Sequence, residues 1–357
     1  MLPMRKRVPN FDRFLQVVRR QGEPDRVPFA ELFHDTEIMT AIQGPPPAPP
    51  DDLDAQCAWR VAFWRDLGYD YITQGVDIGF PWPALVAEDT AALPHEQRGW
   101  VNEAKGPVAS WQEFEAYPWP EVTPAAFRTI EATARHLPEG MKIAAIMPGG
   151  PFENLTFLMG FEQFSFALVD QPDLVAAIAQ RVDEILCKVV EVTASMESVG
   201  AQWLNDDMGF KGATLASPQV LREYIFPTQR RICAIAHRHG KPVLLHSCGK
   251  LDEIMGELIA DIGIDAKHSF EDVIMPVWQA KRKWGARMAL LGGVDMDVLA
   301  RGSEEQVRSY TRRCIEQCAP GGGWALGSGN TVANYVPVRN FLAMLDEGRR
   351  CGAYSRA

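Results

Sequence analysis

The sequence predicts a single (β/α)8 barrel, the TIM-barrel fold, on three observations. Short apolar, β-branched or aromatic runs alternate with longer segments of helical periodicity, which is typical of βα units around a parallel sheet. There are eight such runs, the number of strands in this barrel. Glycine follows the end of several predicted helices, as at Gly68, Gly200 and Gly240, where it is a common helix cap before the next strand.

The predicted elements begin with a helix. Residues 11–20 carry apolar side chains at helical spacing, which indicates an amphipathic N-terminal helix. Between residues 81 and 124 the chain contains an insertion in which 84–86 and 98–102 are predicted to form a small β-hairpin flanked by proline-rich turns. The eight predicted barrel strands are 27–33, 69–74, 142–148, 201–207, 242–248, 264–270, 288–294 and 324–330.

One alternative fold is a doubly wound open sheet. Such a sheet would place a glycine-rich phosphate turn after its first strand. Here His34-Asp35-Thr36-Glu37 follows the first predicted strand, and the next glycine is Gly44. No change of composition marks a second domain, so we expect residues 1–357 to form one barrel domain.

Composition excludes several classes of function. Among 357 residues, 46% are hydrophobic, which can supply a large core. The net charge of −10 argues against nucleic acid or an anionic membrane as the main partner. No apolar run approaches the roughly 18 residues of a membrane span, and no signal peptide is evident. The seven scattered cysteines do not resemble a disulfide framework, so we expect a cytoplasmic protein.

Polar residues collect where the predicted strands end. In a (β/α)8 barrel the C-terminal ends of the strands hold the active site, so chemistry-bearing side chains there indicate an enzyme. The candidates are Glu31, His34, Asp77, Glu153, Asn205, Asp207, His246, Cys248, Lys267, His268 and Asn330.

The segment from His246 to Cys248 carries the most specific pattern. Residues i and i+2 of a strand point to the same side, so both side chains can enter the barrel mouth. Imidazole and thiolate are ligands of Zn²⁺. The alternative is a buried cysteine beside a histidine bonded to backbone. Of Asp206 and Asp207, at most one faces the mouth unless the strand has already ended.

Four stretches carry a family resemblance: Gly150-Pro151-Phe152-Glu153, Leu245-His246-Ser247-Cys248-Gly249, Leu291-Gly292-Gly293-Val294-Asp295 and Gly327-Ser328-Gly329-Asn330. With the order of elements from Phe11 onward, the chain resembles the uroporphyrinogen decarboxylase superfamily. That superfamily shares a (β/α)8 barrel and includes decarboxylases and zinc-dependent, corrinoid-linked methyltransferases.

The decarboxylase branch fits poorly. Its arginine-rich segment after strand one corresponds to Glu31-Leu32-Phe33-His34-Asp35, which contains no arginine. The histidine of its Gly-His-Gly motif corresponds to Ser328. Only an acid after strand two, Asp77, matches this branch.

The methyltransferase branch fits better. The resemblance implies that His246 and Cys248 bind zinc, whereas Asn330 stands where the family has its later cysteine ligand. We expect Glu153 to replace that ligand, with Asp207 and Glu31 as alternatives, which makes a mixed N, S, O site suited to a methoxy oxygen.

The resemblance thus implies methyl transfer from a small methylated donor, such as an aryl methyl ether, to a corrinoid on a separate protein that docks at the barrel mouth. A homodimer is one possible assembly. We assign catalytic roles to Asp207, Asp77 and His268. Substrate contacts are assigned to Glu31, His34, Asn205, Lys267 and Asn330. Two other functions stay open: decarboxylation of another carboxylic acid, small or tetrapyrrole-like, and non-catalytic binding of a small molecule.

Overall fold

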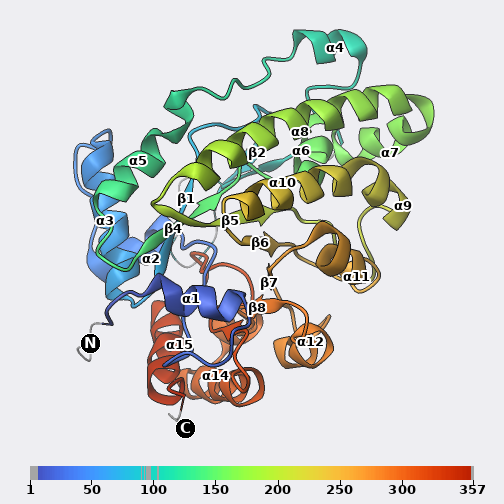
Figure 1. The fold of residues 1–357 in the computed structure, drawn as a ribbon. Coiled ribbons are helices and arrows are strands. Elements are labelled where there is room, and N and C mark those ends of the chain that lie inside the picture. The colour runs from blue at the N-terminus through green and yellow to red at the C-terminus, as the bar shows by residue number, and fades with distance from the viewer. Residues whose placement is uncertain (1–6, 90, 92, 94–97, 103, 355–357) are drawn as a thin grey trace.

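A curled parallel sheet surrounded by helices forms the centre of the fold (Figure 1). The computed structural model describes residues 7–89, 91, 93, 98–102 and 104–354. Within them, neighbouring strands follow the order β1-β4-β5-β6-β7-β8-β9, and every pair is parallel. The predicted barrel fold is thereby confirmed. The strands are β1 (Tyr71–Gly75), β4 (Lys142–Ile146), β5 (Val199–Asn205), β6 (Val243–His246), β7 (Ala266–His268), β8 (Ala289–Leu291) and β9 (Trp324–Ala325).

The first predicted strand, 27–33, differs from the prediction because it forms no continuous ladder. Phe29 makes an isolated parallel bridge to Leu326, and His34 makes another to Val332. The segment therefore lies beside β9 and closes the barrel without being a regular strand.

Local chemistry explains the missing ladder. Pro28 has no N–H to contribute to a sheet. The Tyr71 hydroxyl accepts from the Glu31 N–H at 2.9 Å and donates to the Glu31 carbonyl at 2.8 Å, so these groups are not available to a strand. Closure also requires a glycine at 327, where a Cβ atom would stand 1.7 Å from the Ala30 carbonyl oxygen.

The predicted hairpin is confirmed. β2 (Ala84–Ala87) pairs antiparallel with β3 (Arg98–Val101). The two strands form a separate sheet, and in the sequence they lie between β1 and β4. None of the helices formed by the described residues combines the length and apolar character needed to cross a bilayer.

Helices cover the outside of the barrel. Figure 1 shows α8 and α10 together over the β5–β6 region, and α14 and α15 together near the opposite end of the sheet. The α-helices are α1 (Phe11–Val18), α2 (Thr36–Gln43), α3 (Leu53–Asp66), α4 (Trp111–Ala116), α5 (Arg128–Arg135), α6 (Pro151–Met159), α7 (Phe161–Asp170), α8 (Pro172–Ser195), α9 (Pro218–Val220), α10 (Phe226–Arg238), α11 (Met255–Glu257), α12 (Val277–Trp284), α13 (Met296–Arg301), α14 (Glu304–Cys318) and α15 (Val338–Cys351). Shorter helical turns lie at Pro124–Phe127, Leu221–Ile225 and Leu258–Ile262.

Helix α1 lies at the N-terminal ends of the strands, and it ends at Val18 rather than at the predicted residue 20. The Asn10 side chain caps it by accepting from the Asp12 N–H. The Phe11 ring occupies the space where a side chain at Gly200, at the start of β5, would stand. This packing covers the end of the barrel opposite the predicted site.

The register decides which side chains face the barrel interior. The register pairs His246 of β6 with Asn205 of β5 on one side and with His268 of β7 on the other. His268 is paired in turn with Leu291 of β8, so these side chains form one row on the same side of the sheet. The Trp203 and His268 rings, from the non-adjacent strands β5 and β7, lie 5.5 Å apart, which identifies this side as the interior.

Candidate functional site

His246 and Cys248 lie together at the C-terminal end of β6, as predicted. The strand ends at His246, and the chain leaves through Gly249, which has a φ of +78° that favours glycine. The His246 Nε2 atom lies 3.5 Å from the Cys248 Sγ atom and 3.5 Å from the Asp207 Oδ1 atom. Ligand atoms of Asp207, His246 and Cys248 all lie within 4.8 Å of one another.

Asp207 joins this group because it lies two residues after Asn205, on the side of the chain that faces the barrel interior. The Cys248 N–H donates to the Asp207 carboxylate at 2.8 Å. Asp206 points the other way. Its carboxylate accepts from the N–H groups of Phe152 and Glu153 at the start of α6, and from the Gln229 amide.

The Cys248 sulfur has polar neighbours. The Asn330 side-chain amide donates to Sγ at 3.3 Å, and the Ser269 hydroxyl donates to it at 3.5 Å. Burial, followed by the negative charge of Asp207, raises the pKa of the thiol to about 12. Asn330 therefore contacts the sulfur at the position where the family resemblance implied another thiolate.

His246 and His268 form a hydrogen-bonded pair inside the barrel. Their Nδ1 atoms are 2.8 Å apart, so one ring donates and the other accepts. Burial lowers the pKa of His246 to about 4. Burial, followed by the charge of His246, lowers the pKa of His268 as well. With His246 neutral and its Nδ1 engaged, its Nε2 atom faces Cys248 and Asp207.

Glu153 lies beside this group and is not one of its three members. It belongs to the first turn of α6, and burial together with the charge of Asp207 raises its pKa to about 7. Within the part of the chain that is described, the carboxylate that the structure brings to His246 and Cys248 is thus that of Asp207, an alternative in the sequence analysis, rather than that of Glu153.

Three other predicted residues have structural partners elsewhere. Both Glu31 oxygens accept from Ser328, from its N–H at 2.7 Å and its hydroxyl at 2.6 Å. The His34 ring packs against Phe63, Trp64 and Phe341. Asp77 accepts from the N–H and hydroxyl of Thr129 in the first turn of α5, so it caps that helix.

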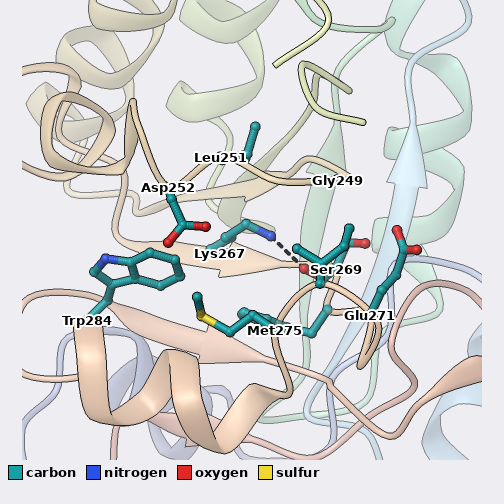
Figure 2. A pocket seen from close by; sticks show the side chains of 10 residues that line it. Gly249, Leu251, Asp252, Lys267, Ser269, Glu271, Met275 and Trp284 are labelled. Carbon is teal, nitrogen blue, oxygen red and sulfur yellow. Dashed lines mark hydrogen bonds between the residues drawn. The ribbon is translucent and has the colours of Figure 1, made fainter. Parts of the chain in front are cut away.

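Two more predicted residues flank His246. Asn205 is its register partner on β5, and its buried Oδ1 atom has no hydrogen-bond partner among the described residues. Lys267 precedes His268 and therefore faces the outside of the barrel, where Figure 2 shows it beside Asp252 and Trp284. Ser269 was missed in the sequence analysis, although its place immediately after a strand-end histidine could have drawn attention to it.

The buried Glu31 predicts a pH-dependent stability. Burial raises the pKa of Glu31 to about 8, so the folded state binds this proton more tightly than the unfolded state does. Its contribution to stability is therefore complete below the unfolded pKa of about 4.3 and is lost as the pH rises towards 8. The Glu31→Gln variant has no such proton. The difference between its melting temperature and that of the wild type should therefore shift in favour of the variant as the pH rises from 5 to 8. Thermal denaturation tests this, with the exposed Glu121→Gln as control; a difference independent of pH would contradict it.

Comparison with known proteins identifies the family. Residues 11–351 match the family described as uroporphyrinogen decarboxylase (URO-D). The chain belongs to the URO-D family. The resemblance seen in the sequence is thereby confirmed.

The relatives of this URO-D-family chain include both reaction types. A segment of 132 residues is 34% identical to a methylated-thiol–coenzyme M methyltransferase of Methanosarcina mazei and covers 37% of this chain and 33% of that protein. A segment of 216 residues is 26% identical to a uroporphyrinogen decarboxylase of Thioalkalivibrio sulfidiphilus and covers 57% of this chain and 58% of that protein. The chain thus matches less than two thirds of the length of either relative.

A solved structure extends the similarity of fold across the chain. A methyltransferase from Methanosarcina mazei superposes with a TM-score of 0.66, covering 95% of this chain and 97% of that structure. The sequence identity is 16%, so this likeness concerns the URO-D-family fold alone.

Proposed function

We propose that this URO-D-family chain is a zinc-dependent methyltransferase that moves a methyl group from a small methylated donor to a corrinoid carried by another protein. One observation carries the proposal: Asp207, His246 and Cys248 bring oxygen, nitrogen and sulfur ligand atoms within 4.8 Å of one another. The group lies at the C-terminal ends of the strands, where TIM-barrel enzymes hold their active sites. Similarity to a methylated-thiol–coenzyme M methyltransferase supports the reaction class.

The residues present fit zinc. Zn²⁺ binds imidazole, thiolate and carboxylate, and catalytic sites use three protein ligands and leave one position for substrate or water. The hydrogen bond between the Nδ1 atoms of His246 and His268 provides the outer partner that fixes a metal-binding imidazole. The Cys248 N–H donates to the Asp207 carboxylate at 2.8 Å, which would fix the carboxylate ligand relative to the thiolate ligand.

The ligand set favours an oxygen donor over a sulfur donor. Bound zinc would act as a Lewis acid on the heteroatom that carries the methyl group. With one thiolate and one carboxylate, less charge is donated to the metal than with two thiolates, which suits a methoxy oxygen such as that of an aryl methyl ether. In the transfer, the reduced cobalt of the corrinoid would supply the electron pair for a new bond to the methyl carbon and be oxidised by two electrons. The bond between oxygen and methyl carbon would break, and the oxygen would keep that electron pair and leave as an alkoxide that takes up a proton from water.

We place the docking surface of the corrinoid protein at the barrel mouth. Four large apolar side chains are exposed on the closing segment 27–33 and on segments that follow strand ends, and they would contribute apolar contact area to this surface. They are Phe33 (41% exposed), Phe210 (64%), Val273 (80%) and Tyr335 (40%).

Decarboxylation is the second candidate, supported by the similarity to a uroporphyrinogen decarboxylase. Two observations disfavour it. Asp77, the acid that matched that branch, caps α5 through Thr129. Glu31, at the position of the arginine-rich segment, uses both oxygens to bind Ser328. A barrel that binds a small molecule without chemistry is the third possibility, and the experiment below separates all three.

The test supplies the zinc-loaded chain with a reduced corrinoid protein and a panel of donors. We expect methylation of the corrinoid, seen in its absorption spectrum. The rate with methoxylated benzoates should be at least about tenfold above that with alkyl thioethers, which corresponds to a difference of roughly 1.4 kcal/mol between the activation free energies for the two donors. Chain without zinc is the control. Release of carbon dioxide from carboxylic acids without methyl transfer would favour the decarboxylase, and ligand binding without either reaction would favour the third possibility.

A further inference from the structure

Lys267 occupies an unusual position behind the candidate metal site. It lies on the outer side of β7 with 4% of its surface exposed, and it lines a cavity of about 20 Å³ with Asp252, Met275 and Trp284 (Figure 2). A cavity of this size holds about one water molecule. The lysine is therefore almost completely covered by the described residues, beside a space for about one water molecule.

The ammonium group is satisfied by backbone. In the described part of the chain, Nζ donates to the carbonyl oxygens of Ser247 at 3.1 Å, His268 at 3.3 Å and Ser269 at 2.5 Å, which uses its three donors. The Phe270 ring lies 4.6 Å from Nζ and adds a cation–π contact. One buried cation thus joins the ends of two adjacent strands, β6 and β7.

The bond to Ser269 has a second consequence. Ser269 has a φ of +81°, a left-handed conformation that is strained for a residue with a side chain. Strained residues persist only where their surroundings hold them. The shortest bond of the Lys267 ammonium is to the Ser269 carbonyl, and the Ser269 hydroxyl reaches the Cys248 sulfur at 3.5 Å.

The bond to Ser247 acts on the other side of the site. The Ser247 carbonyl belongs to the peptide bond between Ser247 and Cys248, and Ser247 itself joins His246 to Cys248. The Ser247 hydroxyl accepts from the Met208 N–H at 3.1 Å, next to Asp207. The position of this one residue therefore affects all three members of the candidate metal site.

We propose that Lys267 is a positioning residue for the site formed by Asp207, His246 and Cys248: its ammonium joins the ends of β6 and β7 and holds Ser269 in the conformation that directs its hydroxyl to the Cys248 sulfur. The proposal rests on the proposed function for the role of the metal. Its geometric part stands independently of zinc. Lys267, expected from the sequence to contact substrate, would instead act through the backbone from outside the barrel.

The first test measures zinc affinity in Lys267→Met. This change keeps an unbranched side chain as far as the Cε atom and removes the ammonium, so the dissociation constant for zinc should rise by about 10- to 100-fold, as for other outer partners of metal ligands. The matched control is Lys283→Met, which removes a positive charge paired with Asp252 at the same cavity without touching the three carbonyls. The control should stay within about twofold of the wild type, since surface ion pairs contribute little.

A double-mutant cycle separates positioning from general support. If Lys267 acts through Ser269, part of its effect is already lost in Ser269→Ala, so the combined change in zinc affinity should be smaller than the product of the two single changes. Single effects that multiply, or an effect of Lys267→Met within twofold of the wild type, would overturn the proposal.

A crystal structure of metal-free Lys267→Met tests the geometry without relying on zinc. We expect Ser269 to adopt a negative φ and its hydroxyl to leave the Cys248 sulfur; retention of the left-handed conformation and the contact would overturn the proposal. If the wild type binds no zinc, the proposed function fails while this result still decides the role of Lys267. If Lys267→Met does not fold, Lys267→Gln, which keeps a neutral N–H donor, should give the same changes to a smaller degree, and an unchanged Ser269 in that variant would count against the proposal.

Discussion

Replacing Cys248 by alanine should abolish stoichiometric zinc binding and slow methyl transfer by about a thousandfold. The sulfur is one of three candidate ligand atoms within 4.8 Å of one another, so its loss would leave two candidate ligands for zinc. Lewis-acid stabilisation is worth several kcal/mol, and a loss of about 4 kcal/mol corresponds to roughly three powers of ten in rate. Elemental analysis and corrinoid methylation measure the two effects on the same preparation.

The matched control is Cys351→Ala. This cysteine lies exposed at the end of α15, where it contacts Glu347, and it has no link to the candidate site. It should leave zinc content and rate near those of the wild type. Equal zinc in the wild type and in Cys248→Ala would show that the sulfur is not a ligand.

Replacing Arg13 by methionine should lower the free energy of unfolding more than any other single substitution proposed for this chain. Its guanidinium donates to Asp70 at 2.6 Å and to Asp25 at 2.5 Å, and Arg13 and Asp70 are only 8% and 2% exposed. Removing one partner of a buried ion pair leaves a buried charge and costs about 3–5 kcal/mol. Chemical denaturation followed by circular dichroism measures the free energy of unfolding.

Two variants refine this result. Arg65→Met breaks the pair between Arg65 and Asp66, which are 41% and 47% exposed, and should cost less than about 1 kcal/mol. Adding Asp70→Asn to Arg13→Met removes the stranded charge and should recover part of the loss. A cost below about 1 kcal/mol for Arg13→Met would contradict the importance of this pair for attaching α1 to the barrel.

The core of the site could be predicted because it depends on local rules. His246 and Cys248 are two residues apart at a strand end, so the alternation of a strand places them on one side. The same alternation along β5 places Asp207 on the interior side with Asn205. That Asp207, rather than Glu153, comes within 4.8 Å of His246 and Cys248 could not be predicted, because it depends on how segments distant in the sequence pack together.

Register and backbone conformation decide where several other predicted residues lie. Lys267 lies beside His268 in sequence, yet adjacent strand residues face opposite sides, so only the histidine enters the barrel. The contribution of Ser269 depends on a left-handed backbone that no sequence pattern announces. His34 was placed at a strand end, but the segment before it is not a regular strand, and its ring joins the aromatic core.

The fold itself was largely predictable. Seven of the eight predicted strands form, and the hairpin at β2 and β3 occurs where the insertion was expected. The remaining segment, 27–33, contains Pro28 and closes the barrel through isolated bridges, because the Tyr71 hydroxyl takes the polar groups of Glu31. A tyrosine from a neighbouring strand thus replaces part of a β-ladder, which the pattern of apolar residues cannot reveal.

X-ray absorption spectroscopy of the zinc-loaded protein tests the central proposal most directly. We expect one zinc ion per chain with a single sulfur neighbour at about 2.3 Å and nitrogen and oxygen neighbours at about 2.0–2.2 Å, matching Cys248, His246 and Asp207. The sulfur signal should be absent in Cys248→Ala. Two sulfur neighbours, or a zinc ion with no sulfur neighbour in the wild type, would contradict it.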